Sequence, residues 1–115
     1  TAETLTLARS IGLNQEMCLD VLNGTPAGRG HLSTTYPAKV LKNDISPAFM
    51  INLAYKDLNI GLDLANEVKV LSRVGIAAKE AYSLAQEQGR GLQDWTAIFS
   101  SLQVSAGLKV PNGQE

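Results

Sequence analysis

Residues 46–69, SPAFMINLAYKDLNIGLDLANEVK, decide the fold of this 115-residue chain. Ser46 followed by Pro47 is typical of a helix N-cap and the first helical residue, and no later proline interrupts the stretch. Apolar residues recur in it with the spacing of a helix face and do not alternate as they would in a strand. The stretch therefore predicts one long helix that begins within two residues of Pro47 and continues past Ala65.

Polar residues divide this helix into two faces when each residue is given about 100° of rotation. One stripe holds Asn52, Lys56, Asn59, Asp63, Asn66 and Glu67. Asp57 falls outside the stripe, beside Leu64 and Val68, where an ionised carboxylate is costly unless it is hydrogen-bonded. We therefore expect Asp57 to be a buried structural carboxylate, for example one that accepts bonds from a neighbouring helix N-terminus. The residue pattern alone favours an ordinary solvated lysine on the polar face for Lys56.

Glycines and capping residues predict further helices on both sides of this one. The expected segments are 2–11 before Gly12, 15–23 after Asn14, a short stretch at 31–41 interrupted at Pro37, 72–88 before Gly89, and 95–106 after Asp94. No segment shows the sustained alternation of a sheet. The sequence thus predicts an all-α domain over residues 1–108, an irregular bundle of about six helices around one long central helix, followed by a polar tail at 109–115.

Composition excludes several classes of protein. Ten basic residues balance 11 acidic ones without clustering, which argues against a nucleic-acid partner, and no apolar run is long enough to span a membrane. Cys18 is the single cysteine, so no disulfide can form within the chain, and we expect a cytoplasmic protein. The single histidine, His31, lacks partners at metal-ligand spacing, so no metal site is expected. The glycines of the segment 25–30, TPAGRG, match neither a dinucleotide fingerprint nor a phosphate-binding loop.

Several short motifs resemble those of the 3-hydroxyisobutyrate dehydrogenase family. SPAF at 46–49, Leu53 and KDL at 56–58 are similar to the family pattern SPGF…L…KDL. In the same order along the chain, Gly12-Leu13 is similar to the family's GLD turn. Gly89-Arg90-Gly91 followed by DWTA at 94–97 is similar to its closing helix. The resemblance extends over residues 2–108.

This resemblance implies the C-terminal domain of a 6-phosphogluconate dehydrogenase-like enzyme, an NAD- or NADP-dependent 3-hydroxyacid dehydrogenase. Such an enzyme oxidises a small hydroxy or sugar acid by hydride transfer. The resemblance places Lys56 and Phe49 on the cofactor side of the active-site cleft. It also implies that the nucleotide-binding domain and the catalytic lysine precede Thr1. We therefore expect no catalytic residue in this chain, no cofactor bound by it alone, an N-terminal nucleotide-binding domain as its partner, and a homo-oligomer.

Arg29 and His31 are candidates for the substrate side. His31 stands where many members of the family have tryptophan, and with Arg29 and the run Ser33-Thr34-Thr35 it resembles the L-threonate dehydrogenase branch. A cation and an imidazole could bind the carboxylate and a hydroxyl of a sugar acid. The alternative is a surface loop without a role in binding. For the whole chain, the alternative is a free-standing helical protein-interaction module whose long helix offers its apolar side to a partner.

Overall fold

The computed structural model describes residues 1–25, 28, 30–31 and 34–110. Over these residues the secondary structure is helical, apart from one isolated bridge between Met50 and Asp94. The elements are α1 (Ala2–Ser10), α2 (Gln15–Asn23), α3 (Thr35–Ala38), the 3-10 helix η2 (Val40–Lys42), α4 (Ile51–Glu67), α5 (Arg73–Glu87), the 3-10 helix η3 (Trp95–Ala97) and α6 (Ile98–Ser105). The expected all-α fold is confirmed. Most of the expected polar tail, residues 111–115, lies outside the described residues.

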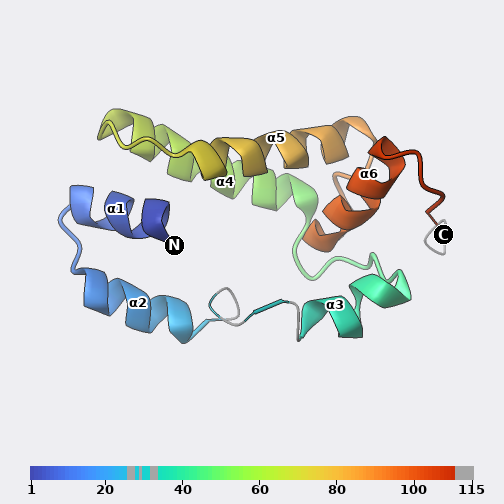
Figure 1. Cartoon of the computed structure of the whole chain (residues 1–115), viewed down its shortest axis with the longest axis horizontal. Helices are drawn as coiled ribbons and strands as arrows, with labels where there is room; N and C mark the ends of the chain where they lie inside the picture. Colours follow the sequence, from blue (N-terminus) through green and yellow to red (C-terminus); the bar gives the residue numbers. More distant parts are fainter. Residues whose placement is uncertain (26–27, 29, 32–33, 111–115) are drawn as a thin grey trace.

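The two longest helices, α4 and α5, lie side by side along the length of the molecule (Figure 1). Near one end of this pair α1 packs against α2, and near the other end α6 packs against α5 and η3. The resulting shape is elongated, with extents of 46 × 27 × 21 Å. The long central helix predicted from the sequence is therefore α4, and α5 covers one of its sides.

Local capping signals set most helix boundaries as expected. The side chain of Asn14 accepts a hydrogen bond from the Met17 amide at 2.9 Å and caps α2. The Asp94 side chain caps η3 by accepting from the Thr96 amide at 3.2 Å. Gly12 and Gly89 follow α1 and α5 with φ of 82° and 77°, a conformation in which glycine is far less strained than other residues. These boundaries depend on neighbouring residues and can therefore be predicted from short motifs.

The start of α4 differs from the prediction. This helix begins at Ile51, and Ser46 does not cap it. The Ser46 hydroxyl instead donates to Asp44 at 2.5 Å and accepts from the Lys39 ammonium at 3.1 Å. Ser46 is thus held in the preceding loop, and the prediction of a start within two residues of Pro47 is wrong.

The first backbone amides of α4 donate hydrogen bonds to a segment that is distant in sequence. The Ile51 amide donates to the Gln93 carbonyl and the Asn52 amide to the Gly91 carbonyl, both at 3.0 Å. The first amides of a helix have no partner within the helix, so these carbonyls replace a local cap. A side chain at position 91 would collide with the Asn52 side chain, 2.4 Å from the ideal Cβ position, so Gly91 allows this close approach.

The described core is small. Ile51, Ala85 and Ala97 form its buried cluster, and the half-buried Ile45 and Tyr82 pack against it. Many large apolar side chains remain exposed, including Ile11, Leu13, Met17, Leu19 and Val21 on the α1–α2 pair, Leu53 and Ile60 on α4, and Leu71, Val74 and Ile76 near the start of α5. A single copy of the chain therefore leaves much apolar surface in contact with water.

Candidate functional site

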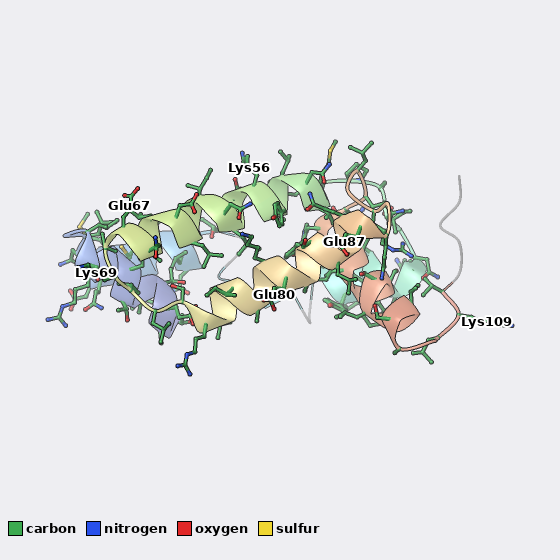
Figure 2. The ribbon with its side chains drawn as sticks, turned by 90° about the horizontal axis from the view of Figure 1, so that it is seen from above. Lys56, Glu67, Lys69, Glu80, Glu87 and Lys109 are labelled. Atoms are coloured by element: carbon green, nitrogen blue, oxygen red, sulfur yellow. The ribbon has the colours of Figure 1, made fainter. Side chains whose placement is uncertain are left out.

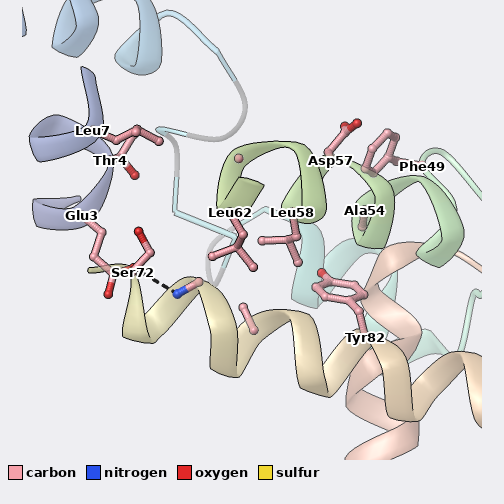
Figure 3. Close-up of a pocket in the computed structure, with 13 residues that line it drawn as sticks. Glu3, Thr4, Leu7, Phe49, Ala54, Asp57, Leu58, Leu62, Ser72 and Tyr82 are labelled. Carbon is pink, nitrogen blue, oxygen red and sulfur yellow. Dashed lines mark hydrogen bonds between the residues drawn. The ribbon is translucent and has the colours of Figure 1, made fainter. Parts of the chain in front are cut away.

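The first turns of α1 border an open cavity of about 510 Å³ between α4 and α5, which we call the cleft (Figure 3). Most of its wall is apolar or made of small residues, and its ionisable groups are those of Glu3, Asp57 and Tyr82. The lining residues are Glu3, Thr4, Leu7, Phe49, Ala54, Asp57, Leu58, Gly61, Leu62, Ser72, Gly75, Ala78 and Tyr82. A mainly apolar cavity of this size with a few polar groups is typical of small-molecule sites.

Gly61 keeps part of the cleft open. It lies inside α4, where alanine would be more favourable by about 1 kcal/mol. A Cβ added at this position would meet no heavy atom within 4 Å. Neither crowding within the described chain nor a positive φ requires glycine here, and its effect is to leave room beside α4.

Phe49 and Asp57 both line the cleft, as Figure 3 shows, but Asp57 is not buried. Its side chain is 55% exposed, and its partner is the adjacent Lys56, 3.2 Å away. The expectation of a buried, structural Asp57 is therefore wrong. Because α5 covers only one side of α4, Leu53 and Ile60 on the same face as Asp57 are themselves 40% and 61% exposed. Apolar neighbours on the helix therefore did not imply burial.

Lys56 lies on the side of α4 that faces away from α5 (Figure 2), and its side chain is 60% exposed. Ion pairs between exposed side chains contribute roughly 0–1 kcal/mol. The Lys56 ammonium can therefore leave Asp57 and bind another anion at a small cost in free energy. This placement leaves Lys56 accessible to a ligand or to another domain.

His31 contacts Trp95, and Trp95 is hydrogen-bonded to Phe49. The His31 Nδ1 is 2.9 Å from the Thr35 hydroxyl, and its ring packs edge-on against Trp95 with the ring centres 4.7 Å apart. The Trp95 amide in turn donates to the Phe49 carbonyl at 2.7 Å. His31 is not among the residues that line the cleft. Arg29, its predicted companion, lies outside the described residues.

Among the residues that the structure describes, Asp94 is the buried carboxylate, and its side chain is fully shielded from solvent. One carboxylate oxygen accepts from the amides of Ala48 and Phe49 at 2.9 and 3.2 Å. The other accepts from the Thr96 amide at 3.2 Å and from the Thr96 hydroxyl at 2.5 Å. The SPAF and DWTA segments therefore meet at this one side chain. The sequence identified Asp94 as a helix cap, but nothing in the local pattern showed that it also binds a segment 45 residues earlier.

The pKa values of Asp94 and Tyr82 are both shifted from their ordinary values. Burial alone would raise the pKa of Asp94, but the hydrogen bonds from Thr96, Ala48 and Phe49 outweigh it and hold the pKa below its usual value. Burial, reinforced by Tyr36 and Asp94, raises the pKa of Tyr82 to about 12. Tyr82 therefore presents a neutral hydroxyl to the cleft at physiological pH.

Neither a metal cluster nor a membrane span is found in the described part of the chain. No three His, Cys, Asp or Glu side chains of residues 1–25, 28, 30–31 and 34–110 come together in a way that could hold a metal ion. Over the same residues, no helix is both long and apolar enough to cross a bilayer.

Comparison with known proteins decides the family. A family model described as "NAD-binding of NADP-dependent 3-hydroxyisobutyrate dehydrogenase" matches residues 1–102. The chain belongs to this family. Membership in the 3-hydroxyisobutyrate dehydrogenase family confirms the resemblance found in the SPAF, KDL and DWTA segments.

The chain is also similar to individual proteins. The chain is 48% identical over 108 residues to the 3-sulfolactaldehyde reductase of Escherichia coli K12, a match covering 94% of this chain and 36% of that protein. It is 28% identical over 102 residues to the human cytokine-like nuclear factor N-PAC, with 85% of this chain and 18% of that protein covered. An imine reductase from Pseudomonas sp. has the same fold, with a TM-score of 0.75 at 17% identity over 88% of this chain and 35% of that chain. The chain thus spans about a third, or less, of the length of these relatives.

Proposed function

We propose that this chain forms the helical wall of the active site in an NAD(P)-dependent oxidoreductase that interconverts a small aldehyde or ketone and a hydroxy acid. The 48% identity to a reductase is the observation that carries the proposal. The family model, whose description names an NADP-dependent dehydrogenase, supports the same class of reaction. A free-standing interaction module would account for the exposed apolar side chains, but it leaves the identity to a reductase unexplained.

Phe49 and Lys56 fit one edge of a nicotinamide cofactor. Phe49 is 38% exposed beside the cleft, and a flat apolar ring of this kind can pack against another ring. Lys56 carries an accessible cation that could bind a phosphate or carboxylate. The cofactor, when bound, supplies hydride transfer, while these side chains bind and orient it. We propose that the general acid or base of the reaction is not a residue of this chain.

For the substrate we propose a small molecule with a strongly acidic group, such as a sulfonate or carboxylate. The relative's name specifies a sulfonated three-carbon aldehyde, whereas the sequence around His31 resembles the branch that acts on four-carbon sugar acids. Both classes share an anionic end. Arg29 and His31 remain our candidates for binding that anion or a neighbouring hydroxyl.

A chimera tests the proposal directly. In the E. coli 3-sulfolactaldehyde reductase, the segment aligned with this chain is replaced by the chain itself. We expect the chimera to reduce 3-sulfolactaldehyde with NADH or NADPH and to oxidise at least one of a panel of small hydroxy acids that includes L-threonate. His31→Trp in the chimera should change the ratio of kcat/KM values between substrates more than it changes the melting temperature.

The isolated chain is the control. We expect it to show neither turnover nor NAD(P)H binding in calorimetry, because it holds no glycine-rich loop for the pyrophosphate. A chimera that folds, as judged by circular dichroism and sedimentation, yet turns over none of these substrates would contradict the proposed function. Unchanged substrate ratios after His31→Trp would remove His31 from the substrate side.

We also propose that the chain self-associates. The exposed apolar residues of α1 and α2, among them Met17 at 68% and Val21 at 67%, line or adjoin a second apolar cavity of about 500 Å³. Covering such a surface is favourable at about 25 cal/mol per Å². Light scattering at increasing concentration should therefore report dimers or larger species, while a monomer throughout would contradict this.

For location in the cell we propose the cytoplasm. The single cysteine, Cys18, leaves the chain without an internal disulfide, as is usual for proteins of reducing compartments. Fractionation of cells that express the protein tests this, and recovery in an extracytoplasmic fraction would contradict it.

A further inference from the structure

The N-terminus of α5 has no cap from its own neighbourhood. Ser72 occupies the N-cap position without making a side-chain hydrogen bond to the helix. The first turn contains no acidic residue and begins with Arg73. The free amides and the positive end of the helix dipole both favour an anion at this point, so the local sequence leaves the helix start unsatisfied.

Glu3 of α1 supplies the missing cap, although it precedes Val74 by 71 residues in the sequence. Its Oε1 accepts from the Val74 amide at 2.7 Å and its Oε2 from the Gly75 amide at 3.0 Å. Figure 3 shows this carboxylate between α1 and the start of α5, at one end of the cleft. Both carboxylate oxygens are therefore committed to one helix terminus, which fixes the position and orientation of the Glu3 side chain.

The packing around this contact is close. A Cβ at Gly75 would lie 3.1 Å from a terminal methyl group of Leu62 and 3.6 Å from the Glu3 carboxylate. Three helices, α1, α4 and α5, thus meet at Gly75, where an added Cβ would require the Leu62 side chain to move by a few tenths of an ångström. We call the pair of hydrogen bonds from Val74 and Gly75 to Glu3 the Glu3 cap.

We propose that Glu3 is a positioning residue, and that the Glu3 cap sets the spacing of α1 from α4 and α5 and so the shape of the cleft. The principal packing partner of α1 is α2, so the Glu3 cap is a specific polar link from this pair to the rest of the domain. Glu3 and Asp57 line the same cleft from different helices. The effect on catalysis rests on the proposed function, because it requires that the cleft side holding Phe49 and Asp57 faces the cofactor.

Amide exchange in the full 115-residue chain tests the cap itself. In Glu3→Ala, the Val74 and Gly75 amides should exchange with solvent about tenfold faster or more, since they lose their acceptors. Glu3→Gln retains one acceptor oxygen and should give an intermediate rate. Glu80→Ala, which removes an exposed glutamate from the middle of α5, is the matched control and should leave both amides unchanged. Equal protection in Glu3→Ala and the unsubstituted chain would overturn the proposal.

Kinetics of the chimera test the consequence for the cleft. Glu3→Ala should raise KM for NADH or NADPH about fivefold while kcat changes less than about twofold, with partial rescue by Glu3→Gln. Faster amide exchange with unchanged KM would show a merely structural cap and overturn the positioning role. If the unsubstituted chimera were inactive, that result would contradict the proposed function and with it the expected effect on KM. The exchange rates of the Val74 and Gly75 amides would still decide whether the Glu3 cap exists.

Discussion

Replacing Asp94 by alanine is expected to lower the free energy of unfolding by about 3 kcal/mol or more, because several donors lose their acceptor in a buried site. Asp94 is fully shielded and accepts from Ala48, Phe49 and Thr96. Its loss would also release the segment that precedes α4. Urea unfolding followed by circular dichroism measures the difference.

Two comparisons isolate the cause. Asp63→Ala, on an exposed part of α4, should change the free energy of unfolding by no more than about 0.5 kcal/mol. Asp94→Asn preserves the shape but turns one acceptor oxygen into an amide nitrogen, so an intermediate loss is expected. If Asp94→Ala were as stable as Asp63→Ala, contacts other than those of Asp94 would have to hold the SPAF and DWTA segments together.

The same carboxylate gives the chain a defined acid sensitivity. The pKa of Asp94 lies below its ordinary value of 3.8, so its stabilising effect is complete above that value and is lost as the pH falls through the lowered folded-state pKa. The urea midpoint should therefore decline below a pH of about 4. Asp94→Asn should show less of this decline, and an identical decline in both proteins would assign it to other carboxylates.

Lys56→Ala is expected to lower kcat/KM of the chimera by about tenfold, equivalent to about 1.4 kcal/mol of transition-state stabilisation. The loss is expected because we propose that Lys56 binds the cofactor. Its side chain is free to do so, since it is exposed and only weakly paired with Asp57. The same change should barely alter the melting temperature of the isolated chain, because the side chain is mostly in solvent. Steady-state kinetics and thermal melts measure the two effects separately.

Lys69→Ala is the matched control, since Lys69 is an exposed lysine just beyond the opposite end of α4 (Figure 2). It should leave kcat/KM unchanged. Asp57→Ala should change the stability of the isolated chain by less than about 0.5 kcal/mol, as expected for an exposed carboxylate. Full activity of the Lys56→Ala chimera would remove Lys56 from the cofactor side.

The fold could be predicted from the sequence wherever helix ends depend on adjacent residues. Asn14 and Asp94 cap helices by bonds that reach only two or three residues ahead, and Gly12 and Gly89 follow helices with positive φ. Such signals are complete within a short window of sequence. The all-α architecture and the long central helix follow in addition from apolar residues that recur with the spacing of a helix face and do not alternate as in a strand.

The start of α4 and the burial of its residues could not be predicted in this way. The amides of Ile51 and Asn52 are satisfied by carbonyls about 40 residues later in the chain, so no rule for neighbouring residues places the helix start. The burial of a residue on α4 depends on which side of that helix another helix covers. Asp57 is exposed although its neighbours on α4 are apolar, because α5 covers only one side of α4. The hydrogen bonds from Ala48 to Asp94 and from Val74 to Glu3 could not be predicted for the same reason, because the partners are distant in sequence.

Hydrogen–deuterium exchange of the chimera with and without NADH or NADPH, read by mass spectrometry, measures most directly which surface faces the cofactor. Peptides covering residues 46–60, which contain Phe49, Lys56 and Asp57, should become protected when the cofactor binds. Peptides from α2 and α6 should exchange at unchanged rates. Protection confined to α2 or α6, with none in residues 46–60, would contradict the assignment of this segment to the cofactor side.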